Sequence, residues 1–244
     1  MNINCELVIL ILALTPYGQV HTGEIIGGHK VAPHKRPYMV LLENHQQNNG
    51  KTYCGAFILS EDFLMTAAHC KAKSHTAFLG SHTIRDNHEG ITVEKAFPHE
   101  DYDASDCSND IMLLKLSSKA TFGENVKLIA VAGDDDGVLP QSCSVSGWGC
   151  TSWDDNHISR VLMELNVTLI TSEMCPKDGS YCSEGENGPV AGDSGGPLVC
   201  EDEKAYGVVS AGKLTKDGLV FRKYTKISAY RSWIDGIMNN PGKP

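Results

Sequence analysis

Short runs of β-branched and aromatic residues recur along the chain from Ile25 onward, separated by Gly, Pro, Asn and Asp. Short strands at this spacing are typical of an all-β barrel or sandwich. The chain has 244 residues, enough for one such unit or for two linked barrels. We therefore predict an all-β fold. The clearest runs lie at residues 38–42, 56–59, 63–66, 111–116, 144–147 and 207–210.

The two ends of the chain follow other patterns. Residues 227–238 carry apolar side chains at near-helical spacing, which predicts a C-terminal amphipathic helix. Residues 7–14 form an apolar run that is too short to cross a bilayer, and small and polar residues follow it. This pattern favours a secretory signal peptide over residues 1–22 rather than a buried strand. No later run is long enough for a membrane helix, so no membrane partner is expected.

The chain is acidic, with a formal net charge of −9 at pH 7. Removal of residues 1–24 takes away Glu6 and Glu24 and no Lys or Arg, which leaves a charge of −7. A negative protein is repelled by the phosphate backbone, so nucleic acid is not an expected partner.

Residues 192–197 read Gly-Asp-Ser-Gly-Gly-Pro, a glycine-rich turn around a serine. Glycine lets the backbone turn sharply and brings its N–H groups close to a bound group. Such N–H groups can hold the oxyanion that forms when a serine attacks a carbonyl. We therefore predict Ser194 as a nucleophile, with the N–H groups of Gly192 and Ser194 as its oxyanion hole.

A base and a carboxylate precede this serine. His69 follows two alanines and precedes a cysteine, and Asp110 begins a buried-looking strand. Alone, such a histidine is usually structural and such an aspartate usually caps a turn. The order His, Asp, Ser matches one of the known layouts of a catalytic triad. In that triad His69 takes the proton of Ser194, and Asp110 orients the imidazole.

These motifs together resemble the chymotrypsin-like serine peptidases, from Ile25 to about Met238. Residues 37–43 and 108–116 are similar to granzymes and mast-cell proteases, and the specificity-pocket pattern is most similar to that of granzyme B. The other matching motifs are Ile25-Ile26-Gly27-Gly28, Gly147-Trp148-Gly149 and Ser210-Ala211-Gly212.

The resemblance implies two six-stranded antiparallel β-barrels with a C-terminal α-helix, and a site between the barrels. The peptidase domain would span residues 25–244. Its parts would be an N-terminal barrel at about 25–128, a C-terminal barrel at about 143–228 and a helix at about 227–238. The implied reaction is hydrolysis of a peptide bond in protein or peptide substrates, without a metal or other cofactor.

Nine cysteines in a chain with a secretory signal indicate disulfides. Cys5 lies in the signal peptide. We expect Cys107 and Cys150 to be thiols, or one of them to form an intermolecular bridge, rather than to pair with each other. The disulfides that the resemblance implies are Cys54–Cys70, Cys143–Cys200 and Cys175–Cys182.

The resemblance also implies a zymogen. Gly23-Glu24 is similar to the activation dipeptide of granule proteases, which a dipeptidyl peptidase removes; the alternative is that it ends the signal region. The new ammonium group at Ile25 would then pair with Asp193 and order the oxyanion-hole loop, because an unpaired buried charge is costly.

Specificity depends on four residues that the resemblance places at the substrate pocket. Gly188 stands where trypsin-like members carry an aspartate, so a preference for Lys or Arg is not expected. Gly212 would form a pocket wall, and Ser210 would support Asp110 or be a buried strand serine. A guanidinium of Arg222 in the pocket would favour cleavage after Asp or Glu. If Arg222 points to solvent, the pocket is neutral and suits Met, Leu or Phe.

Two further departures concern the subsites before the cleaved residue. Ala211 replaces a large aromatic that usually lines the extended substrate chain, and Cys107 lies near the preceding subsite. A possible N-glycan acceptor is Asn166 in Asn-Val-Thr.

The resemblance implies a secreted or granule-stored enzyme of cytotoxic or immune defence, with serpin-type proteins as inhibitors. The acidic charge argues against storage on anionic proteoglycan and favours an extracellular or digestive peptidase as the alternative. A non-catalytic binding protein on the same fold is a further alternative.

Overall fold

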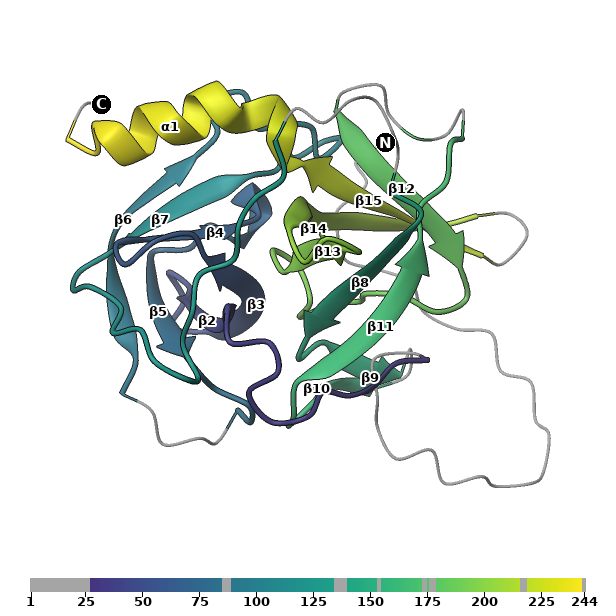
Figure 1. Cartoon of the computed structure of the whole chain (residues 1–244), viewed down its shortest axis with the longest axis horizontal. Helices are drawn as coiled ribbons and strands as arrows, with labels where there is room; N and C mark the ends of the chain where they lie inside the picture. The colour runs from purple at the N-terminus through teal and green to yellow at the C-terminus, as the bar shows by residue number, and fades with distance from the viewer. Residues whose placement is uncertain are drawn as a thin grey trace.

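The computed structural model describes residues 27–84, 89–133, 140–152, 155–172, 175, 179–215 and 219–242. The predicted signal peptide, the Gly23-Glu24 dipeptide and Ile25 therefore lie outside the described residues. The described chain forms two curled antiparallel sheets, with purple to teal strands in one and mostly green to yellow strands in the other (Figure 1). The predicted all-β class is confirmed.

The first half forms a closed six-stranded barrel in the order β2-β3-β4-β7-β6-β5. Strands β2, β3, β4 and β7 are rich in buried apolar residues, as the sequence pattern predicts, whereas β6 has no fully buried residue. The strands are β2 (Met39–His45), β3 (Lys51–Ile58), β4 (Phe63–Thr66), β5 (Ser74–Leu79), β6 (Ile91–Pro98) and β7 (Met112–Leu116).

The second half forms a seven-stranded sheet in the order β1-β11-β8-β13-β14-β15-β12, beside a two-stranded hairpin. An isolated bridge between Leu169, just after β11, and Ser183 of β12 joins the two sides of this sheet, so the strands from β11 to β12 curl towards closure. The strands of the sheet are β1 (His29–Lys30), β8 (Ser142–Gly147), β11 (Met163–Thr168), β12 (Ser180–Gly185), β13 (Pro197–Cys200), β14 (Ala205–Leu214) and β15 (Val220–Lys226). The hairpin consists of β9 (Cys150–Ser152) and β10 (Asp155–Ile158).

Strand β1 precedes the first barrel in the chain but pairs with the second sheet. It lies near the start of the chain, yet it pairs with β11 of the second sheet, with His29 opposite Glu164 and Lys30 opposite Met163. The range expected for the first barrel therefore begins with a strand that belongs to the second sheet.

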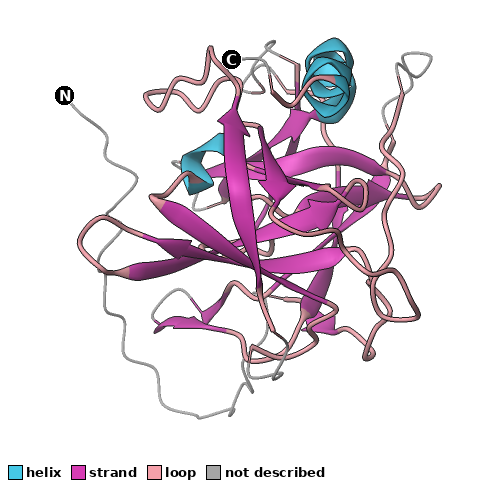
Figure 2. Ribbon diagram, turned by 90° about the vertical axis from the view of Figure 1, so that its left-hand side faces the viewer, coloured by secondary structure: helices cyan, strands magenta, loops and turns pink. Residues whose placement is uncertain are grey.

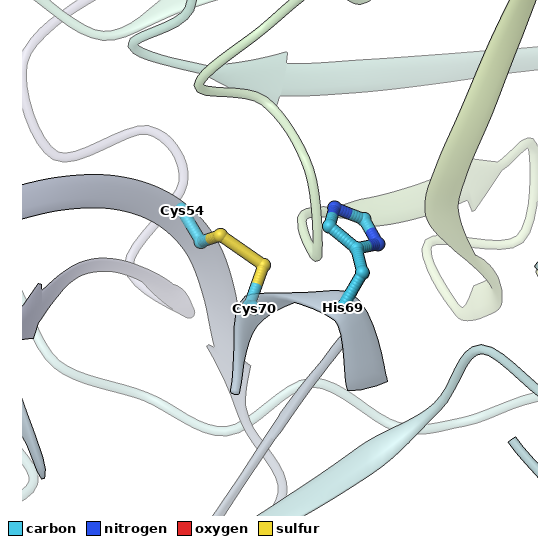
Figure 3. A group of neighbouring side chains, drawn as sticks. All are labelled: Cys54, His69 and Cys70. Atoms are coloured by element: carbon cyan, nitrogen blue, oxygen red, sulfur yellow. A yellow bond between two sulfur atoms is a disulfide. The ribbon is translucent and has the colours of Figure 1, made fainter. Parts of the chain in front are cut away.

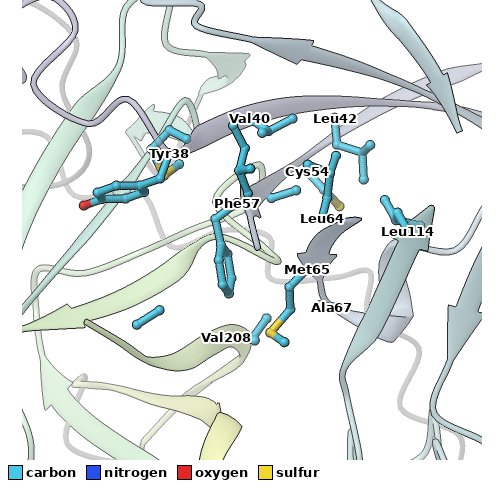
Figure 4. Close-up of a cluster of buried hydrophobic side chains, with 14 of the residues drawn as sticks. Tyr38, Val40, Leu42, Cys54, Phe57, Leu64, Met65, Ala67, Leu114 and Val208 are labelled. Atoms are coloured by element: carbon cyan, nitrogen blue, oxygen red, sulfur yellow. The ribbon is translucent and has the colours of Figure 1, made fainter. Parts of the chain in front are cut away.

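One hydrophobic cluster joins the two halves. Val208 of β14 belongs to the same buried cluster as Met65 of β4 and Ala67, the residue that follows β4 (Figure 4). Trp148 and Leu162 of the second half belong to it as well. Burial of one such aliphatic side chain contributes about 1.5–3 kcal/mol. The segment after β4 is therefore held against the second half.

The C-terminal segment returns to the first barrel. It begins as a 3-10 helix, η2 (Ile227–Tyr230), and continues as α1 (Arg231–Asn239). Ile234 is buried in the cluster of the first barrel, and the ring of His99 lies 5.2 Å from the rings of both Tyr230 and Trp233. Figure 2 shows α1 at one end of the strands. No helix within the described residues is long and apolar enough to cross a membrane.

Candidate active site

His69 lies in the 3-10 turn η1 (Ala68–Cys70), three residues after β4 ends. The buried side chains of Ala67 and Ala68 anchor this turn, and a Cys54–Cys70 disulfide ties it to β3 (Figure 3). The side chain of His69 is 25% exposed, so the imidazole is fixed at its base and open to a ligand.

Cys54, His69 and Cys70 place their donor atoms within 4.8 Å of one another, a spacing compatible with a metal ion. Both sulfur atoms belong to the disulfide in Figure 3, so neither is a thiolate that could bind a metal. The group therefore offers one ligand, which does not make a zinc site.

Asp110 is fully buried and binds His69 twice. Its Oδ1 accepts the backbone N–H of His69 at 2.9 Å, and its Oδ2 lies 2.7 Å from His69 Nδ1. Ser210 Oγ donates to the same Oδ2 at 2.6 Å. Burial alone would raise the pKa of Asp110, but the hydrogen bonds from His69 and Ser210 outweigh it and hold the pKa below its usual value. The carboxylate is therefore ionised and oriented towards His69.

The loop before Asp110 is held by the second half of the chain. Asn109 has a positive φ of 53° and donates through its side chain to the carbonyl of Asp101. Tyr230 donates its hydroxyl to Asn109 Oδ1 at 3.0 Å, and Thr225 Oγ1 donates to the carbonyl of Asp110 at 3.0 Å. The position of Asp110 thus depends on contacts from residues more than 100 positions away.

Ser194 lies in a tight turn that packs against the segment leading to His69. Gly192 and Gly195 have φ values of 97° and 81°, which side chains other than glycine rarely adopt. A Cβ atom at Gly195 would lie 3.0 Å from the backbone nitrogen of Ala67, so this close approach also requires glycine. The N–H of Gly55 donates to the carbonyl of Ser194 at 2.7 Å.

Two backbone N–H groups of this turn have no hydrogen-bond acceptor among the described residues. Among the described residues, the N–H groups of Gly192 and Ser194 donate no hydrogen bond. Two such N–H groups in a tight turn around a partly exposed serine can bind an oxyanion. These are the two donors that the sequence predicts.

Asp193 is buried directly behind the turn. Its carboxylate accepts the N–H of Gly149 at 2.7 Å and the N–H of Val190 at 3.0 Å. A Cβ at Gly147 or Gly149 would overlap this carboxylate, which explains the glycines of the Gly147-Trp148-Gly149 motif. Complete burial raises the pKa of Asp193 to about 6, against the lowering effect of the two N–H groups.

The side chain of Arg222 lies against Gly188, and Arg222 as a whole is only 1% exposed. Its Nε donates to the carbonyl of Pro189 at 3.2 Å, and its Nη1 donates to the carbonyls of Gly185 and Val220. Nη2 is buried and has no partner among the described residues. Any side chain at Gly188 would overlap the guanidinium, so glycine is required there. Burial lowers the pKa of Arg222.

The pairing of β14 with β15 places the remaining predicted residues. Gly212 lies opposite Arg222 and Ala211 lies opposite Lys223, while a bulge precedes Ala211. Ser210 stands in this bulge, and its hydroxyl reaches Asp110. Bulges next to active sites commonly re-aim a side chain in this way.

Six of the cysteines within the described residues form disulfides. The structure contains the three pairs named above from the resemblance, Cys54–Cys70, Cys143–Cys200 and Cys175–Cys182. Cys107 and Cys150 form no disulfide within the described residues.

Three contacts of this site were not predicted. Two are those of Thr225 and Tyr230 described above, and in the third Lys223 Nζ donates to the carbonyl of Cys107 at 3.0 Å. Lys223 and Thr225 are spaced by two residues on one strand, which places them on one face. That alternation was visible in the sequence, but the loop that this face contacts belongs to the other half of the chain.

The comparisons with known proteins agree with this geometry. The family model described as Trypsin matches residues 25–234. Granzyme E of Mus musculus is 40% identical, over 94% of this chain and 97% of that protein. Mast cell protease 3 of Ovis aries is also 40% identical, over 94% of each chain.

Two further comparisons give the same result. Granzyme B of Homo sapiens is 36% identical, over 95% of this chain and 98% of that protein. A solved structure described as "Structure of GrC" has a TM-score of 0.80 and 35% identity, over 88% of this chain and 100% of that chain. The chain therefore belongs to the trypsin family, as a chymotrypsin-like serine endopeptidase similar to granzymes and mast cell proteases.

Proposed function

We propose that this endopeptidase cleaves peptide bonds after Asp or Glu, with Ser194 as nucleophile, His69 as general base and Asp110 as the group that orients His69. The observation that carries the catalytic part is the chain of hydrogen bonds from Ser210 through Asp110 to His69 Nδ1. With Nδ1 donating to a buried carboxylate, Nε2 is the nitrogen that can accept a proton.

Each step then conserves atoms and charge. The Ser194 hydroxyl attacks the carbonyl carbon while His69 Nε2 takes its proton, and the carbonyl oxygen becomes an oxyanion. The N–H groups of Gly192 and Ser194 bind that oxyanion. His69 then gives the proton to the leaving amine, which frees the second peptide and leaves an acyl-enzyme. Water, deprotonated by His69, hydrolyses the acyl-enzyme and restores Ser194.

The buried guanidinium of Arg222 supports the acidic preference. Its described partners are neutral carbonyls, and Nη2 has none. A buried charge without an opposite charge is costly, so a substrate carboxylate that reached it would be strongly favoured. The alternative in which Arg222 points to solvent conflicts with its 1% exposure.

Replacing Arg222 with glycine is expected to lower kcat/KM for peptides cleaved after Asp by about 100-fold, because a charge-assisted hydrogen bond is lost. Cleavage after Leu, Met or Phe should not fall, and labelling of Ser194 by an organophosphate should persist. The measurement is a panel of peptides that differ only at the cleaved residue, with Arg231→Ala on the exposed helix α1 as the control cation. A native enzyme that prefers Leu, Met or Phe over Asp would reject the proposal in favour of a neutral pocket.

We also propose that activity requires removal of Gly23-Glu24 by a dipeptidyl peptidase, so that the Ile25 ammonium can pair with Asp193. What supports this is the buried carboxylate of Asp193, whose described partners are two backbone N–H groups. An N-terminal sequence of the active form that begins elsewhere than Ile25 would contradict this proposal. The alternative, that Gly23-Glu24 ends the signal region, predicts the same start without a separate processing step.

The precursor that retains Gly23-Glu24 is expected to lose stability as pH rises from about 4 to about 6. An unfolded aspartate gives up its proton near pH 3.8, whereas folded Asp193 keeps it until about pH 6. The folded state binds the extra proton between these values, so its stability falls by about 3 kcal/mol across the window. Thermal unfolding in a Ser194→Ala background, which prevents self-cleavage, measures this.

Two variants control that measurement. Asp193→Asn should remove the loss of stability in the Ser194→Ala background and, with Ser194 intact, should prevent the gain of activity on processing. Asp235→Asn on the exposed face of α1 should change neither. An equal pH dependence in the precursor and in Asp193→Asn would contradict the assignment.

We infer from the family that the enzyme is secreted or stored in granules and acts in immune defence, with serpin-type proteins as inhibitors. Asn166 is exposed on β11, which is compatible with a glycan there. The net charge of −9 for the whole chain supports the second candidate, an extracellular or digestive peptidase that does not bind proteoglycan. Localisation in producing cells distinguishes the two, and labelling of Ser194 excludes a non-catalytic binding protein.

A further inference from the structure

His75 and Asn44 form a buried polar pair in the first barrel. His75 of β5 is 3% exposed, and Asn44, which lies opposite it on β2, is 1% exposed. His75 Nδ1 lies 2.8 Å from Asn44 Oδ1. An amide oxygen only accepts hydrogen bonds, so Nδ1 carries the proton, and Nε2 is the unprotonated nitrogen of a neutral imidazole.

His75 Nε2 is buried and has no hydrogen-bond partner among the described residues. In the neutral ring this nitrogen carries only a lone pair. Protonation would make it a second N–H donor and would place a positive charge where the described residues offer no acceptor. The closed barrel therefore favours the neutral form of His75.

The charged groups of β2 and β3 lie away from this imidazole. Successive strand residues point to opposite faces, so Glu43 and His45 lie on the face of β2 opposite to Asn44. On that face, Glu43 lies 3.3 Å from His45 and accepts hydrogen bonds from Lys51 and Tyr53 of β3. These groups therefore give a protonated imidazole no direct partner.

The other neighbour of β5 is β6, whose acidic residue Glu94 is exposed and binds Lys115. Its basic residue Lys95 lies over an aromatic ring of the same strand. Burial lowers the pKa of His75 most, and the charge of His45 lowers it further, to about 4. An unfolded histidine binds its proton already near pH 6.5, so the stability of the fold is complete above that value and is lost as the pH falls towards 4.

The pair lies at the end of the barrel from which the turn of His69 continues. The turn η1 ends at Cys70, and β5 begins shortly after it, at Ser74. Just before β5, the N–H of Lys73 donates to the carbonyl of His45 at 3.0 Å. The pairing of β5 with β2 therefore anchors the chain that leaves the turn of His69.

The Cys54–Cys70 disulfide ties the same turn to the neighbouring strand β3 (Figure 3). Cys54 lies opposite Leu42 of β2, and Asn44 follows two residues later on the same face of β2. Separation of β2 from β5 at Asn44 would therefore loosen the support of His69.

We propose that the His75–Asn44 pair is an acid-sensitive switch in the first barrel. Protonation of His75 opens β2 from β5, loosens the turn that carries His69 and lowers the peptidase activity. This effect adds to the direct protonation of His69 in acid. It involves neither Arg222 nor Asp193, so it is independent of the proposed specificity and of the proposed activation.

Unfolding by denaturant between about pH 4 and pH 7 tests the switch, in a Ser194→Ala background that prevents self-cleavage. His75→Asn removes the titrating ring and keeps a side-chain N–H donor near the position of Nδ1. The unfolding equilibrium constant of the chain with His75, divided by that of His75→Asn, should rise about 300-fold as the pH falls from 6.5 to about 4. All these chains carry Asp193, so its own pH dependence cancels in the ratio.

Two further variants assign the effect to this pair. His45→Asn is the matched control, because the side chain of His45 is 32% exposed and lies on the other face of β2; it should leave most of the 300-fold change in place. Asn44→Asp keeps the titrating ring but gives its protonated form an opposite charge, so the loss of stability in acid should disappear. This second variant tests the proposal even if His75→Asn fails to fold.

Hydrogen exchange and surviving activity test where the barrel opens. At about pH 4.5, the backbone N–H groups of β2 and β5 should exchange faster in the chain with His75 than in His75→Asn, whereas those of β13 and β14 should exchange equally. Comparison at one pH cancels the chemical exchange rate. With Ser194 intact, His75→Asn should keep more of its activity after incubation at about pH 4.5 and return to neutral pH.

The outcomes separate this switch from other effects of acid. An equal loss of stability with and without His75 overturns the proposal, and so does a loss that His45→Asn abolishes. A difference in stability without a difference in surviving activity overturns it as well, because His69 would then be unaffected. If Ser194 is not labelled at neutral pH, the proposed function fails, while the unfolding and exchange measurements still decide whether His75 opens the barrel.

Discussion

Replacing Ser194 with alanine is expected to lower kcat by about a millionfold, because the acyl-enzyme can no longer form and the remaining groups of a triad do not act separately. Binding of substrate should change little, since the turn keeps its glycines at Gly192 and Gly195. The measurement is single-turnover cleavage of the best peptide from the panel. Loss of organophosphate labelling should accompany the loss of activity.

Ser228→Ala is the matched control for this variant. The hydroxyl of Ser228 is buried and has no partner among the described residues, and it lies in η2, outside the proposed catalytic groups. Its removal should leave both kcat and labelling unchanged. Residual turnover in Ser194→Ala within a hundredfold of the native rate would contradict the assignment of the nucleophile.

Replacing Asp110 with asparagine is expected to lower kcat by about 10⁴-fold while the fold is kept. Asp110 accepts three hydrogen bonds, from the N–H of His69, from His69 Nδ1 and from Ser210 Oγ. An asparagine side chain presents an NH₂ group at one of these places, where only an acceptor fits. If that group faces His69, Nδ1 must become the acceptor and Nε2 carries the proton, so Nε2 cannot take the proton of Ser194.

Asp101→Asn controls for the loss of one negative charge from the same loop. The side chain of Asp101 is exposed, and its contact with Asn109 uses its backbone carbonyl. Steady-state kinetics should show a fall in kcat with little change in KM for Asp110→Asn, and near-native values for Asp101→Asn. A comparable fall in both variants would show that the charge of the loop, rather than the orientation of His69, is what matters.

Much of this protein could be predicted from local patterns. The apolar runs at 38–42, 56–59, 63–66 and 111–116 overlap β2, β3, β4 and β7, because a buried sheet selects such residues regardless of their partners. The first part of β3, residues 51–55, lies outside the predicted run. The turns around Ser194 could be expected for a similar reason, since Gly192 and Gly195 mark positive φ values that are a property of the chain itself.

The start of the C-terminal helix could not be predicted from the local sequence pattern. Residues 227–238 have one apolar periodicity, but the structure divides them into a 3-10 turn and an α-helix that begins at Arg231. Tyr230 ends the turn where its hydroxyl meets Asn109 of the first barrel. That contact depends on the packing of two distant segments, so periodicity could not place the boundary.

The sequence by itself determined the all-β class and the candidate triad, because strand periodicity, tight glycine turns and the order of His69, Asp110 and Ser194 are local features of the chain. Only the tertiary structure decided that the Arg222 guanidinium is buried beneath Gly188 and that the Lys223 ammonium reaches Cys107. Both outcomes depend on the bulged register of β14 against β15. A shift of one residue in that register would exchange the two faces of β15, and the sequence of one strand does not specify its register against another.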